Sequence, residues 1–103
     1  MSAVVRVLIY HRTADVEGIE AAYHQTSRDL AGVPGLLGNE LLRSVHDPAS
    51  FVVVSMWESR EAFDRWERGA EHKDTTAPLR PFRDTTSGRP FGVYEVSSSY
   101  TDY

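Results

Sequence analysis

The chain contains no cysteine among its 103 residues. Disulfides, thiolate metal sites and thiol catalysis are therefore excluded, and thiol usage gives no indication of the redox compartment. The chain also lacks long apolar runs: Phe51 to Val54, among the longest, is far shorter than the roughly 20 residues that cross a bilayer. Residues Met1 to Arg12 lack the apolar core and cleavage site of a secretory signal peptide. We therefore expect a cytoplasmic protein that does not enter a membrane.

An excess of positive charge is absent as well. The sequence has 15 acidic and 11 basic residues, which give a net charge of −4, and the two signs are mixed along the chain. The chain therefore has no basic stripe that could bind the phosphate backbone of a nucleic acid, and we expect no nucleic-acid partner. An apolar share of 41% and a charged share of 25% are typical of an ordinary globular protein. A chain of this length has room for one core, so we expect a single domain over residues 1–103.

Four segments of the chain have the composition of β-strands. They are rich in β-branched and aromatic residues, and turn residues or helical patterns separate them. We expect the strands at residues 4–11, 36–46, 51–58 and 91–97. Asp47-Pro48-Ala49-Ser50 supplies turn residues, so the second and third strands should form a hairpin.

Two segments between these strands have helical periodicity. In the first, a largely apolar stripe recurs at steps of three and four residues, which predicts an amphipathic helix. The stripe consists of Ile19, Tyr23, Thr26 and Leu30. In the second, Ser59 is a suitable N-cap, so a helix should begin at Arg60. A further helical turn or two is expected within residues 72–82, where prolines break the pattern.

The predicted order is strand, helix, strand, strand, helix, strand. This βαββαβ order is that of the ferredoxin-like split βαβ fold, an α+β architecture with a four-stranded antiparallel sheet. The first strand, V-V-R-V-L-I-Y-H, is apolar on both faces, and so is the third. Two helices can cover only one face, and the other would expose more apolar surface than soluble monomers usually tolerate. We therefore expect a homodimer in which a second copy covers that face.

The segment Phe51 to Trp66, F-V-V-V-S-M-W-E-S-R-E-A-F-D-R-W, resembles the antibiotic biosynthesis monooxygenase superfamily. In that superfamily the third strand typically ends in a W-E-S-like motif before an amphipathic helix, and the V-P-G-L-L-G segment and D-P turn fit too. The resemblance extends from Val4 to Tyr94. It implies a dimeric α+β barrel with a pocket between helices and sheet, where several members oxygenate aromatic substrates without metal or flavin. We accordingly expect no cofactor.

One branch of the superfamily consists of quinone-forming enzymes of aromatic polyketide pathways. In that branch an Asn stands four residues before the tryptophan of the motif, and a Tyr stands six residues after it. The tryptophan is kept here as Trp57, whereas the other two positions hold Val53 and Phe63. This chain therefore shares the tryptophan of that branch but lacks its two polar side chains.

A second branch degrades haem. Its additional tryptophan is matched here by Trp66, but its haem-ligating His and its first-strand Asn correspond to Thr76 and Leu8. Haem iron needs an axial ligand in such a pocket. Haem degradation would therefore require His72 to supply the imidazole. No histidine and carboxylate have the spacing of a known metal motif, so we expect no protein-bound metal.

Oxygenation without a cofactor requires a substrate that supplies the electrons itself, such as a deprotonated phenol or anthrone. The protein then binds a flat ring, moves a proton, stabilises an oxyanion and excludes water. His72 is the candidate base, because histidine titrates near neutral pH. Trp66 is the candidate catalytic residue that stacks on the ring. The competing interpretations are a partly exposed residue at a helix end for His72 and a core residue for Trp66.

Further residues are candidates for substrate binding. Arg80 and Arg83 have the charge to contact a phenolate or a carboxylate, or else lie in a solvated loop. Asn39 shares a strand face with Leu37 and Leu41, where a buried polar group needs a partner. The complete set of substrate-binding candidates is Tyr23, Asn39, Trp57, Phe63, Arg80 and Arg83. For Trp57 and Phe63 the alternative is core packing.

These inferences predict a cofactor-independent monooxygenase that oxidises a polycyclic aromatic phenol or anthrone, an aromatic polyketide intermediate, to a quinone. Its partners would be a small aromatic substrate, O2 and a second copy of the chain. Three alternatives stay open: a polyketide cyclase of the same fold, a haem-binding or haem-degrading protein, and a structural dimer without activity. Oxygen consumption separates the oxygenase from the cyclase, and a haem titration tests the third class.

Overall fold

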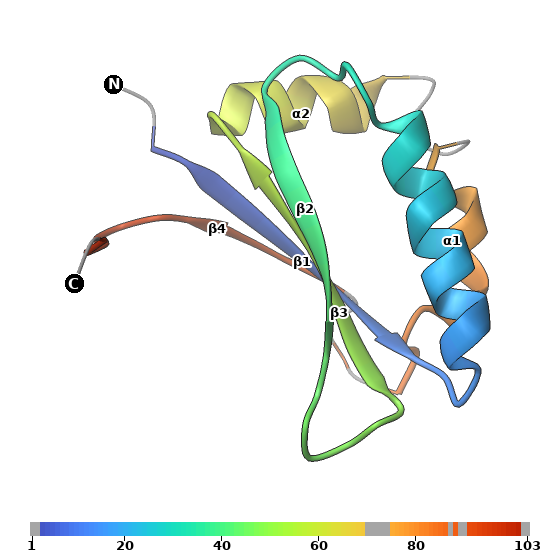
Figure 1. The fold of residues 1–103 in the computed structure, drawn as a ribbon. Coiled ribbons are helices and arrows are strands. Elements are labelled where there is room, and N and C mark those ends of the chain that lie inside the picture. Colours follow the sequence, from blue (N-terminus) through green and yellow to red (C-terminus); the bar gives the residue numbers. More distant parts are fainter. Residues whose placement is uncertain (1–2, 70–74, 87, 89–90, 102–103) are drawn as a thin grey trace.

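In the computed structural model of the chain, the described residues are 3–69, 75–86, 88 and 91–101 (Figure 1). The elements are β1 (Val5–Arg12), α1 (Val16–Asp29), β2 (Leu36–Arg43), β3 (Ser50–Trp57), α2 (Arg60–Arg68), the short 3₁₀ helix η1 (Ala77–Phe82) and β4 (Phe91–Glu95). The sheet is antiparallel throughout, with the strand order β2-β3-β1-β4. The predicted α+β, ferredoxin-like fold is confirmed, with η1 as the helical turns expected before the last strand.

Both main helices begin at side-chain caps. The carboxylate of Asp15 accepts a hydrogen bond from the backbone N–H of Gly18 at 2.9 Å, and α1 starts directly after Asp15, at Val16. The hydroxyl of Ser59 accepts one from the N–H of Ala62 at 3.1 Å, which confirms the predicted start of α2. Each cap satisfies a backbone donor that the first helical turn leaves without a partner.

The strand β2 begins at Leu36 as predicted, but it ends earlier than predicted and its pairing is irregular near the start. It stops at Arg43, because the Ser44 hydroxyl accepts hydrogen bonds from the backbone N–H groups of His46 and Asp47 and so begins the hairpin turn. Near its start the pairing shifts between Leu36 and Gly38. The intervening Leu37 is 61% exposed, so it does not share the face of Asn39 as the alternation predicted.

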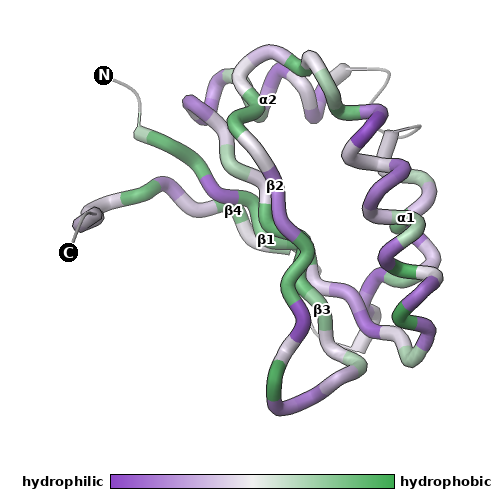
Figure 2. The backbone as a smooth tube through the Cα atoms, in the orientation of Figure 1, coloured by the Kyte–Doolittle hydropathy of each residue, from purple (hydrophilic) through white to green (hydrophobic). Residues whose placement is uncertain are grey.

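The helices lie on one side of the sheet, which is strongly apolar along β1 and β3 (Figures 1 and 2). The buried side chains beneath the helices include Val5, Val7, Ile19, Phe51, Trp57 and Phe63. The other side of the sheet, here termed the open face, carries Val4, Leu42 and Tyr94, which are 36%, 46% and 51% exposed. Within the described ranges, none of the helices has the length and apolar character needed to span a bilayer.

Candidate functional site

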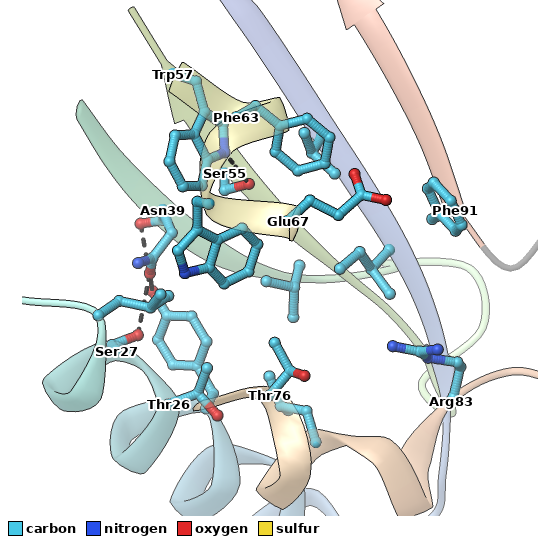
Figure 3. Close-up of a pocket in the computed structure, with 17 residues that line it drawn as sticks. Thr26, Ser27, Asn39, Ser55, Trp57, Phe63, Glu67, Thr76, Arg83 and Phe91 are labelled. Carbon is cyan, nitrogen blue, oxygen red and sulfur yellow. Dashed lines mark hydrogen bonds between the residues drawn. The ribbon is translucent and has the colours of Figure 1, made fainter. Parts of the chain in front are cut away.

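A cavity lies between the helix-covered face of the sheet and the three helices (Figure 3). Its volume is about 140 Å³, roughly ten times the space that one ordered water requires. The apolar side chains that line it are Val7, Ile9, Leu30, Val53, Trp57, Phe63, Trp66, Leu79 and Phe91. A concave, mainly apolar cavity with a few polar groups is typical of a site for a small organic molecule.

Three aromatic side chains form one wall of the cavity. The ring centroids of Trp57 and Trp66 are 5.2 Å apart with planes at 34°, and those of Trp57 and Phe63 are 5.6 Å apart at 68°. Trp57 is 1% exposed, and its indole N–H donates to the Ser55 hydroxyl at 2.9 Å. Trp57 and Phe63 therefore pack in the core and also line the cavity. The two interpretations from the sequence, core packing and a place in the cavity, both apply to them. Trp66 packs half-buried against the same cluster.

A polar cluster from α1 and β2 forms one end of the cavity (Figure 3). The Tyr23 hydroxyl donates to Asn39 Oδ1 at 2.5 Å, and the Ser27 hydroxyl donates to the same oxygen at 3.1 Å. Asn39 lies directly across from Ser55 in the pairing of β2 with β3. Two hydroxyls thus donate to Oδ1, and Nδ2 is the donor group of this side chain.

Arg83 lines the cavity on the side away from Asn39 (Figure 3). It follows η1 and forms an isolated antiparallel bridge with His11 beside β1. Its side chain is half-buried, and its Nε atom is buried without a hydrogen-bond partner in the described part of the chain. The cavity therefore has a cationic side opposite a neutral polar end.

His11 is buried next to Arg83, with only 2% of its surface exposed. Its Nδ1 donates to the backbone oxygen of Ile9 at 3.0 Å. Burial lowers the pKa of His11, the hydrogen bond to Ile9 opposes this, and the positive charge of Arg83 lowers the pKa further. The imidazole is therefore neutral at pH 7. His11 does not line the cavity.

The structure brings most of the predicted site residues together. Those that line the cavity are Tyr23, Asn39, Trp57, Phe63, Trp66 and Arg83. Arg80 does not line it; its side chain is exposed and donates to the Thr76 hydroxyl at 3.4 Å. The predicted base, His72, lies outside the described residues. The catalytic or binding role of each residue stays a prediction.

Sequence reasoning missed several polar residues of the cavity, among them Ser27 and Glu67. Glu67 places its carboxylate on the side of Phe91 (Figure 3). A signal for both residues was present in the helical spacing. Ser27 stands four residues after Tyr23, and Glu67 stands four residues after Phe63, so each shares a helix face with a predicted site residue.

Haem binding requires an imidazole ligand for the iron, and the described part of this cavity has none. The lining contains no histidine, and the position of the haem-ligating His is held by Thr76, which is 9% exposed and lines the cavity. A hydroxyl does not replace an imidazole as the usual axial ligand of haem iron. In the described residues, no group of three or more His, Cys, Asp or Glu is placed to hold a metal ion. The residues described do not fit haem.

The family model of the antibiotic biosynthesis monooxygenases matches residues 2–78. The chain belongs to this family. Protein SchA of Streptomyces halstedii is 36% identical over 72 residues, which cover 70% of this chain and 19% of SchA. The chain thus spans about a fifth of the length of that curated relative.

Solved structures share the fold at lower identity. SnoaB, a cofactor-independent oxygenase from Streptomyces nogalater, has a TM-score of 0.77 and 20% identity, and the match covers 99% of this chain and 100% of SnoaB. The heme-degrading protein Rv3592 of Mycobacterium tuberculosis has a TM-score of 0.72 and 22% identity, with coverage of 99% and 100%. At these identities the likeness shows the fold.

Proposed function

We propose that the protein is a cofactor-independent oxygenase that converts a polycyclic aromatic phenol or anthrone to a quinone with O2. The observation that carries the proposal is the aromatic cavity with a hydrogen-bonded polar cluster at one end and a cation on the other side. Family membership and the shared fold of SnoaB, itself a cofactor-independent oxygenase, support it. Such a cavity holds a flat ring system whose edge oxygens need hydrogen-bond partners.

The reaction balances without an added reductant. The substrate's ring CH2 becomes C=O, one O2 is consumed, and one water is released, so the substrate supplies all four electrons. Loss of a C–H proton gives a carbanion that adds O2, and the resulting peroxide loses water to leave the carbonyl. The protein's tasks are to accept the proton, to stabilise the negative oxygen and to exclude bulk water.

Ring stacking, stabilisation of the negative oxygen and proton transfer are each assigned to a residue that lines the cavity. Trp66 stacks on the ring of the substrate. The Asn39 amide, whose oxygen is held by Tyr23 and Ser27, donates to the oxygen on which negative charge develops. Glu67 supplies a carboxylate on the cavity wall, and we assign it the role of proton acceptor. The predicted base, His72, keeps the same role as an alternative.

An oxygen electrode tests the proposal with 1,8-dihydroxyanthrone as the probe. We expect the protein to accelerate O2 uptake above spontaneous autoxidation, with one O2 consumed for each anthraquinone formed. With ¹⁸O2, one labelled oxygen should enter the new carbonyl group. Equal conversion with and without O2, or an unchanged rate in the presence of the protein, would contradict the oxygenase.

We also propose that the functional unit is a homodimer in the cytoplasm. The open face of the sheet, with Val4, Leu42 and Tyr94, carries apolar side chains that soluble monomers seldom expose together. A second copy brings an equal apolar face and a two-fold symmetric contact. The cavity lies on the opposite side of the sheet, so each copy keeps its own site.

A further inference from the structure

The cavity opens toward solvent between α2 and β4. Among the described residues that line it, Glu67 on α2 and Phe91 on β4 are the exposed ones, and Phe91 is 47% exposed. The other lining residues are buried or half-buried. Glu67 directs its carboxylate to the side of Phe91 (Figure 3). These two side chains therefore border the mouth of the cavity.

A groove lies between α2 and β4 next to this mouth. Its volume is about 320 Å³, and the residues that line it are Arg60, Phe63, Asp64, Glu67, Val93 and Glu95. Phe63 and Glu67 line the cavity as well, so the two spaces share a wall. Phe91 and Val93 are two residues apart on β4, and such residues point to the same side of a sheet. The groove is therefore continuous with the cavity through the mouth.

The floors of the cavity and the groove belong to one surface of the sheet. β1 and β4 are neighbours, and Val93 in the groove pairs with Val7, which lines the cavity. Paired side chains on one face of an antiparallel ladder have Cβ atoms about 5 Å apart. A flat ring system that rests on Val7 can therefore extend over Val93 along the same surface.

The cavity alone has room for only part of a polycyclic substrate. Its volume is about 140 Å³, and an apolar cavity of about 150 Å³ holds a single benzene ring. Pockets for larger organic ligands have volumes of about 300–1,000 Å³. A three-ring substrate therefore needs more space than the cavity supplies, and the groove lies where the additional rings would emerge.

We propose that the groove between α2 and β4 is a second substrate subsite. One ring of the substrate lies in the cavity, and the remaining rings pass the mouth and lie in the groove over Val93. This inference rests on the proposed function for the polycyclic nature of the substrate. Phe63 and Val93 supply apolar contacts for the outer rings. The Arg60 and Asp64 side chains, an ion pair at 3.6 Å, supply hydrogen-bond partners for oxygen substituents on those rings.

NMR titrations of the backbone amides of the unaltered protein test the inference with two probes. Phenol has one ring, whereas 1,8-dihydroxyanthraquinone has three and is already oxidised at the reactive carbons. We expect both probes to shift the amide signals of Val53 and Ser55 beside the cavity. Only the three-ring probe should also shift those of Asp64 and Glu95 beside the groove. A three-ring probe that does not bind, or that binds without shifting the groove signals, would overturn the inference.

Val93→Phe narrows the groove at a position that does not line the cavity. It should weaken the binding of the three-ring probe about tenfold or more, because the outer rings overlap the new side chain. The affinity for phenol should stay unchanged, which also shows that the variant folds. Val45→Phe is the matched control, since it makes the same exchange at a 90% exposed position outside both spaces. It should change neither affinity. An unchanged affinity of Val93→Phe for the three-ring probe would contradict the subsite.

The two proposals fail separately. The three-ring probe consumes no O2, so its binding does not depend on oxygenase activity. An anthrone assay without enzymatic O2 uptake, together with groove signals that the three-ring probe shifts, would refute the oxygenase and keep the subsite. Oxygenation of anthrone with unshifted groove signals would do the reverse.

Discussion

Gly35 lets α2 pack against the start of β2, and an added methyl group should show how tightly. Gly35 has φ = +85°, and a Cβ built on it would lie within 3.0 Å of the Cβ of Ala62 on α2, closer than real Cβ contacts. Gly32 has the same φ, but a Cβ there would meet nothing within 4 Å. The two glycines thus form a matched pair, because Ala strains the backbone at both and overlaps a neighbour only at Gly35.

The expected losses in the free energy of unfolding follow from the backbone strain and the steric overlap. Gly32→Ala should lower the free energy of unfolding by about 1 kcal/mol, the cost of a left-handed backbone conformation for a residue with a Cβ. Gly35→Ala should lower it by about 2–4 kcal/mol, because overpacking adds about 1–3 kcal/mol when neither methyl can rotate away. Ala62→Gly in the Gly35→Ala background should recover part of the loss, since it removes the overlapping atom.

Urea unfolding followed by tryptophan fluorescence measures the unaltered chain, the three single variants, Ala62→Gly among them, and the double variant, because Trp57 packs against α2 and Trp66 lies on it. The additional cost of Gly35→Ala over Gly32→Ala is the decisive quantity. A difference below about 0.5 kcal/mol, within the range of ordinary surface substitutions, would refute tight packing of α2 at this point. Additive effects of Gly35→Ala and Ala62→Gly would likewise refute the contact between the two residues. Since Phe63 and Trp66 on α2 line the cavity, loss of this contact should also weaken ligand binding.

Three further outcomes are expected. Because folding lowers the pKa of His11 from its ordinary 6.5, the unfolded chain takes up the proton first, so stability should fall as the pH decreases from about 7. His11→Gln should flatten this dependence in urea unfolding, whereas His24→Gln, at an exposed position, should not. Tyr23→Phe should lower kcat/KM for 1,8-dihydroxyanthrone about tenfold, because Asn39 Oδ1 loses one of its two donors; an unchanged value would contradict the role of the cluster. Sedimentation equilibrium should give twice the chain mass, and Leu42→Glu on the open face should give the monomer.

The parts of the fold that could be predicted are those that depend on residues close together in the sequence. The cap at Ser59 and the alternation of Val5 and Val7 need only the local sequence, and both appear as expected. The end of β2 could not be predicted, because the Ser44 hydroxyl competes with the strand ladder for backbone donors. The exposure of Leu37 depends on a shift in pairing with β3, which the composition of β2 does not reveal.

The candidate site required long-range information that the sequence pattern lacks. Tyr23 and Asn39 were each predicted to bind substrate, but their contact depends on how α1 lies over β2. A slip of one residue in the pairing of β2 with β3 would turn Asn39 to the open face and leave Tyr23 without it. Arg83 and Arg80 are equivalent in sequence terms, and only the bridge with His11 places Arg83 in the cavity.

The polar end of the cavity also shows how this chain differs from the quinone-forming branch that it resembles. That branch carries its Asn at the position of Val53 on β3, whereas here the amide comes from Asn39 on β2. In the sheet, Val53 pairs with Leu41, so Asn39 lies one strand across and two residues along, a displacement of about 8 Å. The hydroxyls of Tyr23 and Ser27 hold the amide at this new place. A substrate oxygen that meets Asn39 must therefore lie at a different edge of the ring system, while the tryptophan shared with that branch, Trp57, lines the cavity.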